Sequence, residues 1–220
     1  MTKLQAVLFD LDGTLLDSAR DFHRILSGML DKTHPALPFE LLRPHVSEGA
    51  RAMVCRAFNA SPDDPATLPL VERFLNAYQD NPTASGALFT GIPPLLDWLD
   101  LQSIPWGIVT NKSERFASLI LAHLELDSRC KTLVCPEHVT HPKPNPEALL
   151  LGCRQLNSLP AQTLYIGDHQ RDIEAGKNAG MPTIACGYGY IGTDEDPASW
   201  QATHLVTDTQ ELRALLESLL

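Results

Sequence analysis

Two acidic residues stand one residue apart at the end of a short apolar run near the start of the chain. Asp10 and Asp12 follow residues 6–9, and Gly13 and Thr14 come directly after them. A carboxylate held in line with a phosphorus atom can attack it as a nucleophile, and a second carboxyl group can protonate the departing oxygen and then activate water. The pair therefore suits phosphoryl transfer, with Asp10 as the nucleophile and Asp12 as the general acid and base.

Polar side chains that could hold a metal ion or an anion follow three later apolar runs. They are a hydroxyl, an amide, an ammonium and two carboxylates: Thr110, Asn111, Lys143, Asp168 and Asp172. Carboxylates brought together repel one another unless they share a cation, and ligands that are all oxygen favour a hard ion, with Mg²⁺ the first choice. Thr110, Asn111 and Lys143 suit the binding of a phosphate group. Thr110 has an alternative role, because it could cap a helix that starts near Ser113.

The elements that must position these residues are short apolar runs separated by helix-like stretches. The runs cover residues 6–9, 106–109, 132–135, 164–166 and 183–185. Such alternation is typical of a parallel sheet buried on both faces, which is a Rossmann-like α/β fold. Ligands of open parallel sheets bind beyond the carboxyl ends of the strands. We therefore expect the polar residues that follow the runs to meet at one edge of the sheet.

A long interval without a clear strand separates the first run from the others. Residues 21–78 carry apolar side chains at helical spacing. We expect an all-helical insertion whose hinges lie at residues 16–18 and 81–86. The predicted domains are an α/β catalytic core, residues 1–16 and 86–220, and a helical cap, residues 17–85.

Composition limits the classes of partner. The chain has 220 residues, 44% of them hydrophobic, and a formal net charge of -10, which argues against sequence-independent binding to nucleic acid or anionic lipid. Five cysteines without a CxxC pair and the lack of a secretory signal favour the cytoplasm. We expect a small-molecule phosphate ester as the substrate, no membrane partner, and a monomer or a homodimer.

Four motifs in order give the chain a resemblance to the haloacid dehalogenase superfamily. They are FDLDGT at residues 9–14, IVTN at 108–111, the lysine of HPKP, and GDHQRD at 167–172. The resemblance implies an aspartyl phosphate on Asp10 and a Mg²⁺ ion held by the Asp10 carboxylate, the Asp12 backbone carbonyl and Asp168. It also implies that Thr110 and Lys143 hold the phosphoryl oxygens.

The same resemblance gives roles to the surroundings of the site. Asp172 would orient Lys143 or a metal-bound water, and the helical cap would close over the site and read the leaving group. His169 stands where close relatives commonly have a second acidic residue, and we expect it to be structural rather than a metal ligand. In the cap, Arg51 could clamp a substrate carboxylate, although a solvated helix arginine is an equal alternative.

Within the superfamily, the chain is similar to phosphoglycolate phosphatases and, more closely, to the N-acetylmuramic acid 6-phosphate phosphatases of bacterial cell-wall recycling. The stretches that carry this similarity are SEGARAMV, WGIVTNKSERFA, VCPEHV, RDIEAGKNAG and YGYI. They imply a phosphatase that acts on N-acetylmuramic acid 6-phosphate or 2-phosphoglycolate.

Three alternative functions use a similar core. A receiver-like signalling module also holds an aspartyl phosphate beside Mg²⁺, but it lacks an acid two residues after the nucleophile and a helical cap. A phosphosugar mutase or a phosphonate hydrolase of the same superfamily would keep the core and differ in the cap. The presence of Asp12 disfavours the signalling module. A phosphonate hydrolase needs a cap lysine that forms a Schiff base, and the residues around Lys32 do not resemble that motif. We therefore expect a phosphatase, with the mutase as the alternative.

Overall fold

The computed structural model describes residues 4–32 and 34–220. Its centre is a six-stranded sheet in the order β5-β4-β1-β6-β7-β8, and every neighbouring pair is parallel. The strands are β1 Ala6–Phe9, β4 Trp106–Val109, β5 Leu133–Val134, β6 Thr163–Gly167, β7 Thr183–Cys186 and β8 His204–Val206. The predicted α/β class with a parallel sheet is confirmed, and each of the five apolar runs overlaps a strand.

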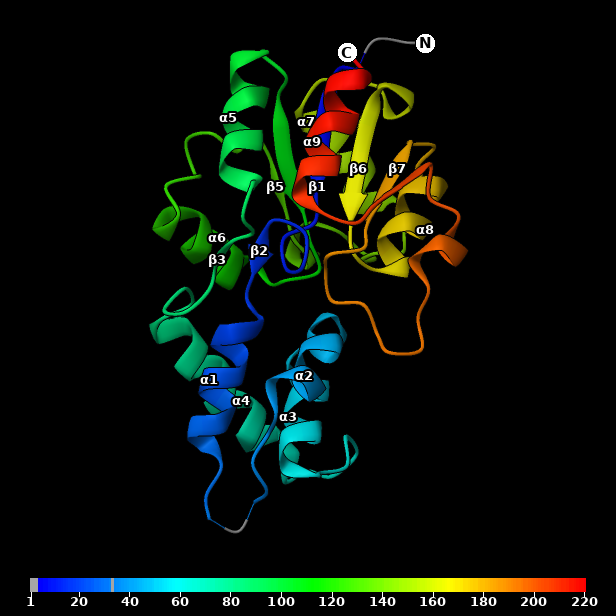
Figure 1. The fold of residues 1–220 in the computed structure, drawn as a ribbon. Helices are drawn as coiled ribbons and strands as arrows, with labels where there is room; N and C mark the ends of the chain where they lie inside the picture. The colour runs from blue at the N-terminus through cyan, green and yellow to red at the C-terminus, as the bar shows by residue number, and fades with distance from the viewer. Residues whose placement is uncertain (1–3, 33) are drawn as a thin grey trace.

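Helices cover both faces of this sheet, as Figure 1 shows. Successive strand residues point to opposite faces, so Val7 and Leu8 belong to different apolar clusters. The Val7 cluster contains residues of α5 Ile92–Leu101, α6 Glu114–His123 and α9 Thr209–Ser218. The Leu8 cluster contains residues of α7 Glu147–Gln155 and α8 Gln170–Asn178. Burial on both faces explains why the strands read as continuous apolar runs.

A group of helices between β1 and β4, the helical segment, lies beyond the carboxyl ends of the strands (Figure 1). It comprises α1 Ala19–Met29, α2 Phe39–Leu42, the 3-10 helix Arg43–Glu48, α3 Ala50–Phe58 and α4 Thr67–Asp80. The insertion is helical, as predicted. Its apolar residues join the Val7 cluster of the core, and the Tyr78 ring lies 5.5 Å from the Phe116 ring between their centroids. The helical segment is therefore packed directly against the core.

Two very short strands mark where the chain enters and leaves the helical segment. β2 Leu16–Asp17 and β3 Ala87–Leu88 form an antiparallel pair. Beside this pair, the buried Asp21 carboxylate accepts hydrogen bonds from the backbone N–H groups of Ser85 and Gly86, both at 2.7 Å. These two strands lie next to the predicted hinges. The assignment of residues 17–85 to a separate domain stays a prediction.

Three short 3-10 helices complete the described elements, at Pro136–His138, Pro160–Gln162 and Pro197–Trp200. In the part of the chain that the structure describes, no helix combines the length and the apolar character needed to cross a membrane.

Candidate active site

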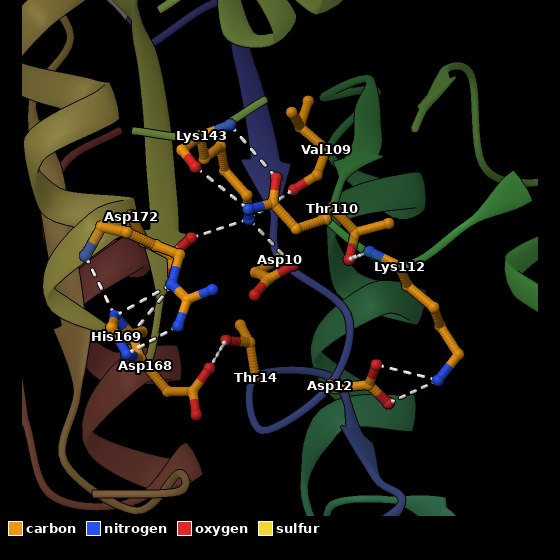
Figure 2. A network of polar contacts seen from close by, with 12 residues as sticks. Asp10, Asp12, Thr14, Val109, Thr110, Lys112, Lys143, Asp168, His169 and Asp172 are labelled. Atoms are coloured by element: carbon orange, nitrogen blue, oxygen red, sulfur yellow. Dashed lines mark hydrogen bonds and ion pairs between the residues drawn. The ribbon is translucent and has the colours of Figure 1, made fainter. Parts of the chain in front are cut away.

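The predicted site residues of four strands meet at one edge of the sheet (Figure 2). Asp10 follows β1, Thr110 follows β4, Lys143 lies in the loop after β5, and Asp168 follows β6. Carboxylate oxygens of Asp10, Asp168 and Asp172 all lie within 4.8 Å of one another. The parallel sheet thus gathers side chains that are far apart in the sequence.

Lys143 is the cation at the centre of this group. Its Nζ atom lies 3.0 Å from Asp10 Oδ1 and 2.7 Å from Asp172 Oδ1, and it also donates to the Val109 carbonyl and the Tyr165 hydroxyl. Burial acts to lower the pKa of Lys143, but the neighbouring carboxylates of Asp10 and Asp172 outweigh burial, so the pKa is raised. Lys143 is therefore a fixed positive charge beside Asp10.

Asp168 lies deeper than Asp10. Its carboxylate accepts hydrogen bonds from the Thr14 hydroxyl at 3.1 Å and from the Tyr190 backbone N–H at 2.9 Å. Burial, followed by the charges of Asp10 and Asp172, raises the pKa of Asp168 well above its usual value. The backbone of the first loop approaches so closely that a Cβ atom on Gly13, whose φ is +83°, would lie 2.0 Å from Asp168 Oδ2.

The donor set fits a hard divalent cation. Three carboxylates face one another with a single ammonium, Lys143, bonded among them, so the group carries an excess of negative charge. All of its ligand atoms are oxygens, which suits Mg²⁺. Asp172 is more constrained than Asp10 and Asp168, because one of its oxygens accepts from Lys143 and the other from the His169 backbone N–H. This geometry agrees with the predicted role of Asp172 in orienting Lys143, which stays a prediction.

The Asp12 side chain turns away from Asp10 toward a residue to which the sequence analysis gave no role (Figure 2). Both Asp12 oxygens accept hydrogen bonds from Lys112 Nζ, at 3.0 and 2.9 Å, and one of them also accepts from the Ser18 hydroxyl. Lys112 stands one residue after the TN pair of the second motif. Its ammonium also lies 5.0 Å from the ring centroid of Phe22 on α1 and 4.7 Å from that of Tyr78 on α4, contacts that sequence spacing does not predict.

Asn111 does not offer its side chain to a phosphate in this structure. Its amide group donates to the Lys143 carbonyl at 3.0 Å and accepts from the Lys143 N–H at 3.1 Å. The predicted phosphate contact through the Asn111 side chain is therefore replaced by a pair of bonds that hold the Lys143 loop in place. Thr110 accepts from the Lys112 N–H and does not cap α6, which begins at Glu114 after Ser113.

The structure does not bring Arg51 to the site. Arg51 is exposed and donates to the Pro62 carbonyl in the loop between α3 and α4. Its helical neighbours Ala50 and Met53, three positions apart, line the cavity, and Arg51 projects from another face of α3. This placement corresponds to the alternative of a solvated helix arginine, and the clamp on a substrate carboxylate stays a prediction.

A cavity of about 390 Å³ lies between the core and the helical segment. On the core side it is lined by Asp10, Asp12, Thr110, Asn111, Lys112, Ser113, Phe116, Lys143, His169 and Arg171. On the side of the helical segment it is lined by Phe22, Val46, Ser47, Glu48, Gly49, Ala50, Met53, Phe74, Leu75 and Tyr78. The polar core wall can hold a phosphoryl group, and the mostly apolar opposite wall faces whatever is attached to that group.

Comparisons with known proteins agree with this geometry. The family described as haloacid dehalogenase-like hydrolase matches residues 7–186. An N-acetylmuramic acid 6-phosphate phosphatase of Pseudomonas aeruginosa is 46% identical over 98% of this chain and 96% of its own. A phosphoglycolate phosphatase of Xanthomonas campestris is 42% identical over 94% of both chains. The solved structure of a predicted phosphoglycolate phosphatase from Haemophilus somnus superposes with a TM-score of 0.85 at 23% identity, over 98% of this chain and 99% of that one.

Proposed function

Because the chain belongs to the haloacid dehalogenase-like hydrolase family and is a phosphatase, we propose that it hydrolyses a small sugar phosphate through an aspartyl phosphate on Asp10. One observation supports this most directly. Asp10, Asp12, Thr110 and Lys143 line the same cavity between the core and the helical segment. The proposed nucleophile, the proposed acid and base, and the proposed anion-binding groups therefore face the same cavity.

In the first half of the reaction, an Asp10 oxygen forms a bond to phosphorus while the bond from phosphorus to the ester oxygen breaks. Lys143 and Thr110 bind the phosphoryl oxygens and keep the phosphorus close to Asp10. For this step Asp12 must be protonated and must turn from Lys112, which it contacts in this structure, toward the departing oxygen; it then donates its proton to that oxygen, and the alcohol leaves.

In the second half, Asp12 accepts a proton from water as the water oxygen attacks phosphorus. The Asp10–phosphorus bond breaks, which releases inorganic phosphate and restores the Asp10 carboxylate. A bound Mg²⁺, held by the carboxylates of Asp10 and Asp168 and the Asp12 backbone carbonyl, would supply positive charge for the phosphoryl oxygens.

The size of the cavity favours N-acetylmuramic acid 6-phosphate over 2-phosphoglycolate as the substrate. A volume of about 390 Å³ is in the range of pockets for ligands larger than a two-carbon acid. A small leaving group would touch few side chains of the helical segment, so it would gain little binding energy there. The relative from P. aeruginosa is a phosphatase of the same sugar phosphate by name. We further assign the enzyme to the cytoplasm, in peptidoglycan recycling.

Hydrolysis of a panel of phosphate esters with Mg²⁺ tests this proposal. We expect kcat/KM for N-acetylmuramic acid 6-phosphate to exceed that for 2-phosphoglycolate and for hexose phosphates at least tenfold, or about 1.4 kcal/mol. EDTA should abolish turnover, and added Mg²⁺ should restore it. A tenfold preference for 2-phosphoglycolate would overturn the choice of substrate. Full activity after chelation would overturn the role of the metal.

A further inference from the structure

Tyr78 has a buried hydroxyl group that the mechanism above does not use. The residue lies near the end of α4 and only 1% of its surface is exposed. Among the described residues, its hydroxyl has no hydrogen-bond partner. A buried hydroxyl without a partner costs free energy, and a ligand bound in the cavity that Tyr78 lines would supply the missing partner.

The surroundings of Tyr78 direct this hydroxyl to the leaving-group end of the cavity. Tyr78 lines the cavity together with Phe22 and Phe74, whose rings offer no hydrogen bond. The Lys112 ammonium lies 4.7 Å from the centroid of the Tyr78 ring and donates its hydrogen bonds to Asp12. Lys112 therefore contacts both Tyr78 and Asp12, and Tyr78 lies on the cavity wall formed by the helical segment, whereas Asp10, Thr110 and Lys143 lie on the core wall.

The Tyr78 hydroxyl can serve as a donor throughout the working pH range. Burial raises the pKa of Tyr78 to about 12, with the positive charge of Lys112 acting in the opposite direction. The phenol is therefore neutral, and its proton is available to an acceptor on a ligand.

We propose that Tyr78 determines specificity, its hydroxyl donating a hydrogen bond to an oxygen of the leaving alcohol other than the ester oxygen. This inference depends on the proposed function, because it concerns the leaving group of the same phosphatase reaction. The acceptor belongs to an oxygen-bearing alcohol, such as a sugar with hydroxyl, ether or acetamido groups. Its carbon skeleton would pack against the rings of Phe22 and Phe74.

The variant Tyr78→Phe tests the proposal because it removes one oxygen and keeps the ring over Lys112. The substrates are N-acetylmuramic acid 6-phosphate and phenyl phosphate, whose leaving group has no oxygen besides the ester oxygen. We expect kcat/KM for the sugar phosphate to fall about tenfold or more, and kcat/KM for phenyl phosphate to change less than about twofold. The melting temperature should change little, because Lys112 keeps both of its hydrogen bonds to Asp12 and the Tyr78 ring stays in place.

The variant Phe74→Leu, one helical turn earlier on α4, is the matched control. It alters the shape of the same cavity wall without touching a polar group, so it should affect both substrates to a similar extent. Equal losses on both substrates in Tyr78→Phe, or no loss on either, would overturn the proposal for Tyr78. A wild-type enzyme that hydrolyses phenyl phosphate but no sugar phosphate would instead refute the proposed substrate, and with it this inference.

Discussion

At the scale of single residues, the site places one ammonium group among three carboxylates at the end of β1. The Asp10 carboxylate lies 3.0 Å from the Lys143 ammonium and shares its surroundings with Asp168 and Asp172. Lys143 is fixed by four further partners, among them the Asp172 carboxylate and the Tyr165 hydroxyl. We therefore expect the reactivity of Asp10 to depend on the negative charge of its side chain more than on the shape of that side chain.

The variant Asp10→Asn separates charge from shape. Asparagine is nearly isosteric with aspartate but is a far weaker nucleophile, so we expect kcat to fall by roughly 10,000-fold or more. The melting temperature should stay close to that of the wild type, because the change also relieves repulsion with Asp168. Steady-state hydrolysis of p-nitrophenyl phosphate and thermal unfolding measure the two effects.

The matched control is Asp63→Asn, which makes the same change at an exposed position of the helical segment. This variant should keep the activity of the wild type. If Asp10→Asn hydrolysed p-nitrophenyl phosphate as fast as the control does, Asp10 could not be the nucleophile.

At the scale of elements, the strands that could be predicted from the sequence are those whose residues are buried on both faces of the sheet. β1 and β4 were found residue for residue, because both faces of these strands are covered and every side chain is apolar. β8 was missed because it is an edge strand of three residues with an exposed leucine, Leu205, and a half-buried His204. The β2–β3 pair was missed because two-residue strands carry no periodic pattern.

In the candidate site too, some residues could be predicted from the sequence and others could not. The motif residues around Asp10 could be predicted because strand ends fix their positions. The placement of Arg51 and the missed role of Lys112 both depend on how the helical segment is oriented against the core. Cation–π contacts from Lys112 to Phe22 and Tyr78, at 5.0 and 4.7 Å, join elements whose relative placement no local pattern specifies.

The residue at the start of α8 predicts how the stability of the protein depends on pH. His169 is the N-cap residue, and its Nδ1 atom accepts from the Arg171 backbone N–H at 3.1 Å, which requires an unprotonated nitrogen. Burial, followed by the charge of Arg171, lowers the pKa of His169 in the folded protein. Below the unfolded pKa of about 6.5, the unfolded chain therefore binds more protons at this residue than the folded one. Stability should fall as the pH drops below about 6.5.

The variant His169→Asn should reduce this dependence, since asparagine caps a helix without titrating. Denaturant unfolding at pH values from about 7.5 to about 5.5 gives the slope for each protein. We expect a shallower loss of stability in His169→Asn than in the wild type. The control is His123→Asn, the same change at an exposed residue of α6, which should keep the wild-type slope. Identical slopes in all three proteins would contradict the role given to His169.

At the scale of the whole molecule, one tyrosine connects the acidic group in the core to the start of the helical segment. The backbone N–H of Tyr190 donates to Asp168 at 2.9 Å. Its hydroxyl accepts from the Ala19 N–H at the start of α1 and donates to the Asp17 carboxylate, both at 3.0 Å. The loop after β7 therefore touches both the proposed metal ligand and the point where the chain enters the helical segment.

The variant Tyr190→Phe should loosen the helical segment more than the core. It leaves the buried Ala19 N–H without its partner, which costs about 1–3 kcal/mol of stability. Tyr188→Phe is a matched control, because the Tyr188 hydroxyl donates to the Thr14 carbonyl within the core. In hydrogen exchange, Tyr190→Phe should speed exchange in residues 19–80, and Tyr188→Phe should leave that region unchanged. Faster exchange there in both variants, or in neither, would show that Tyr190 does not hold the helical segment to the core.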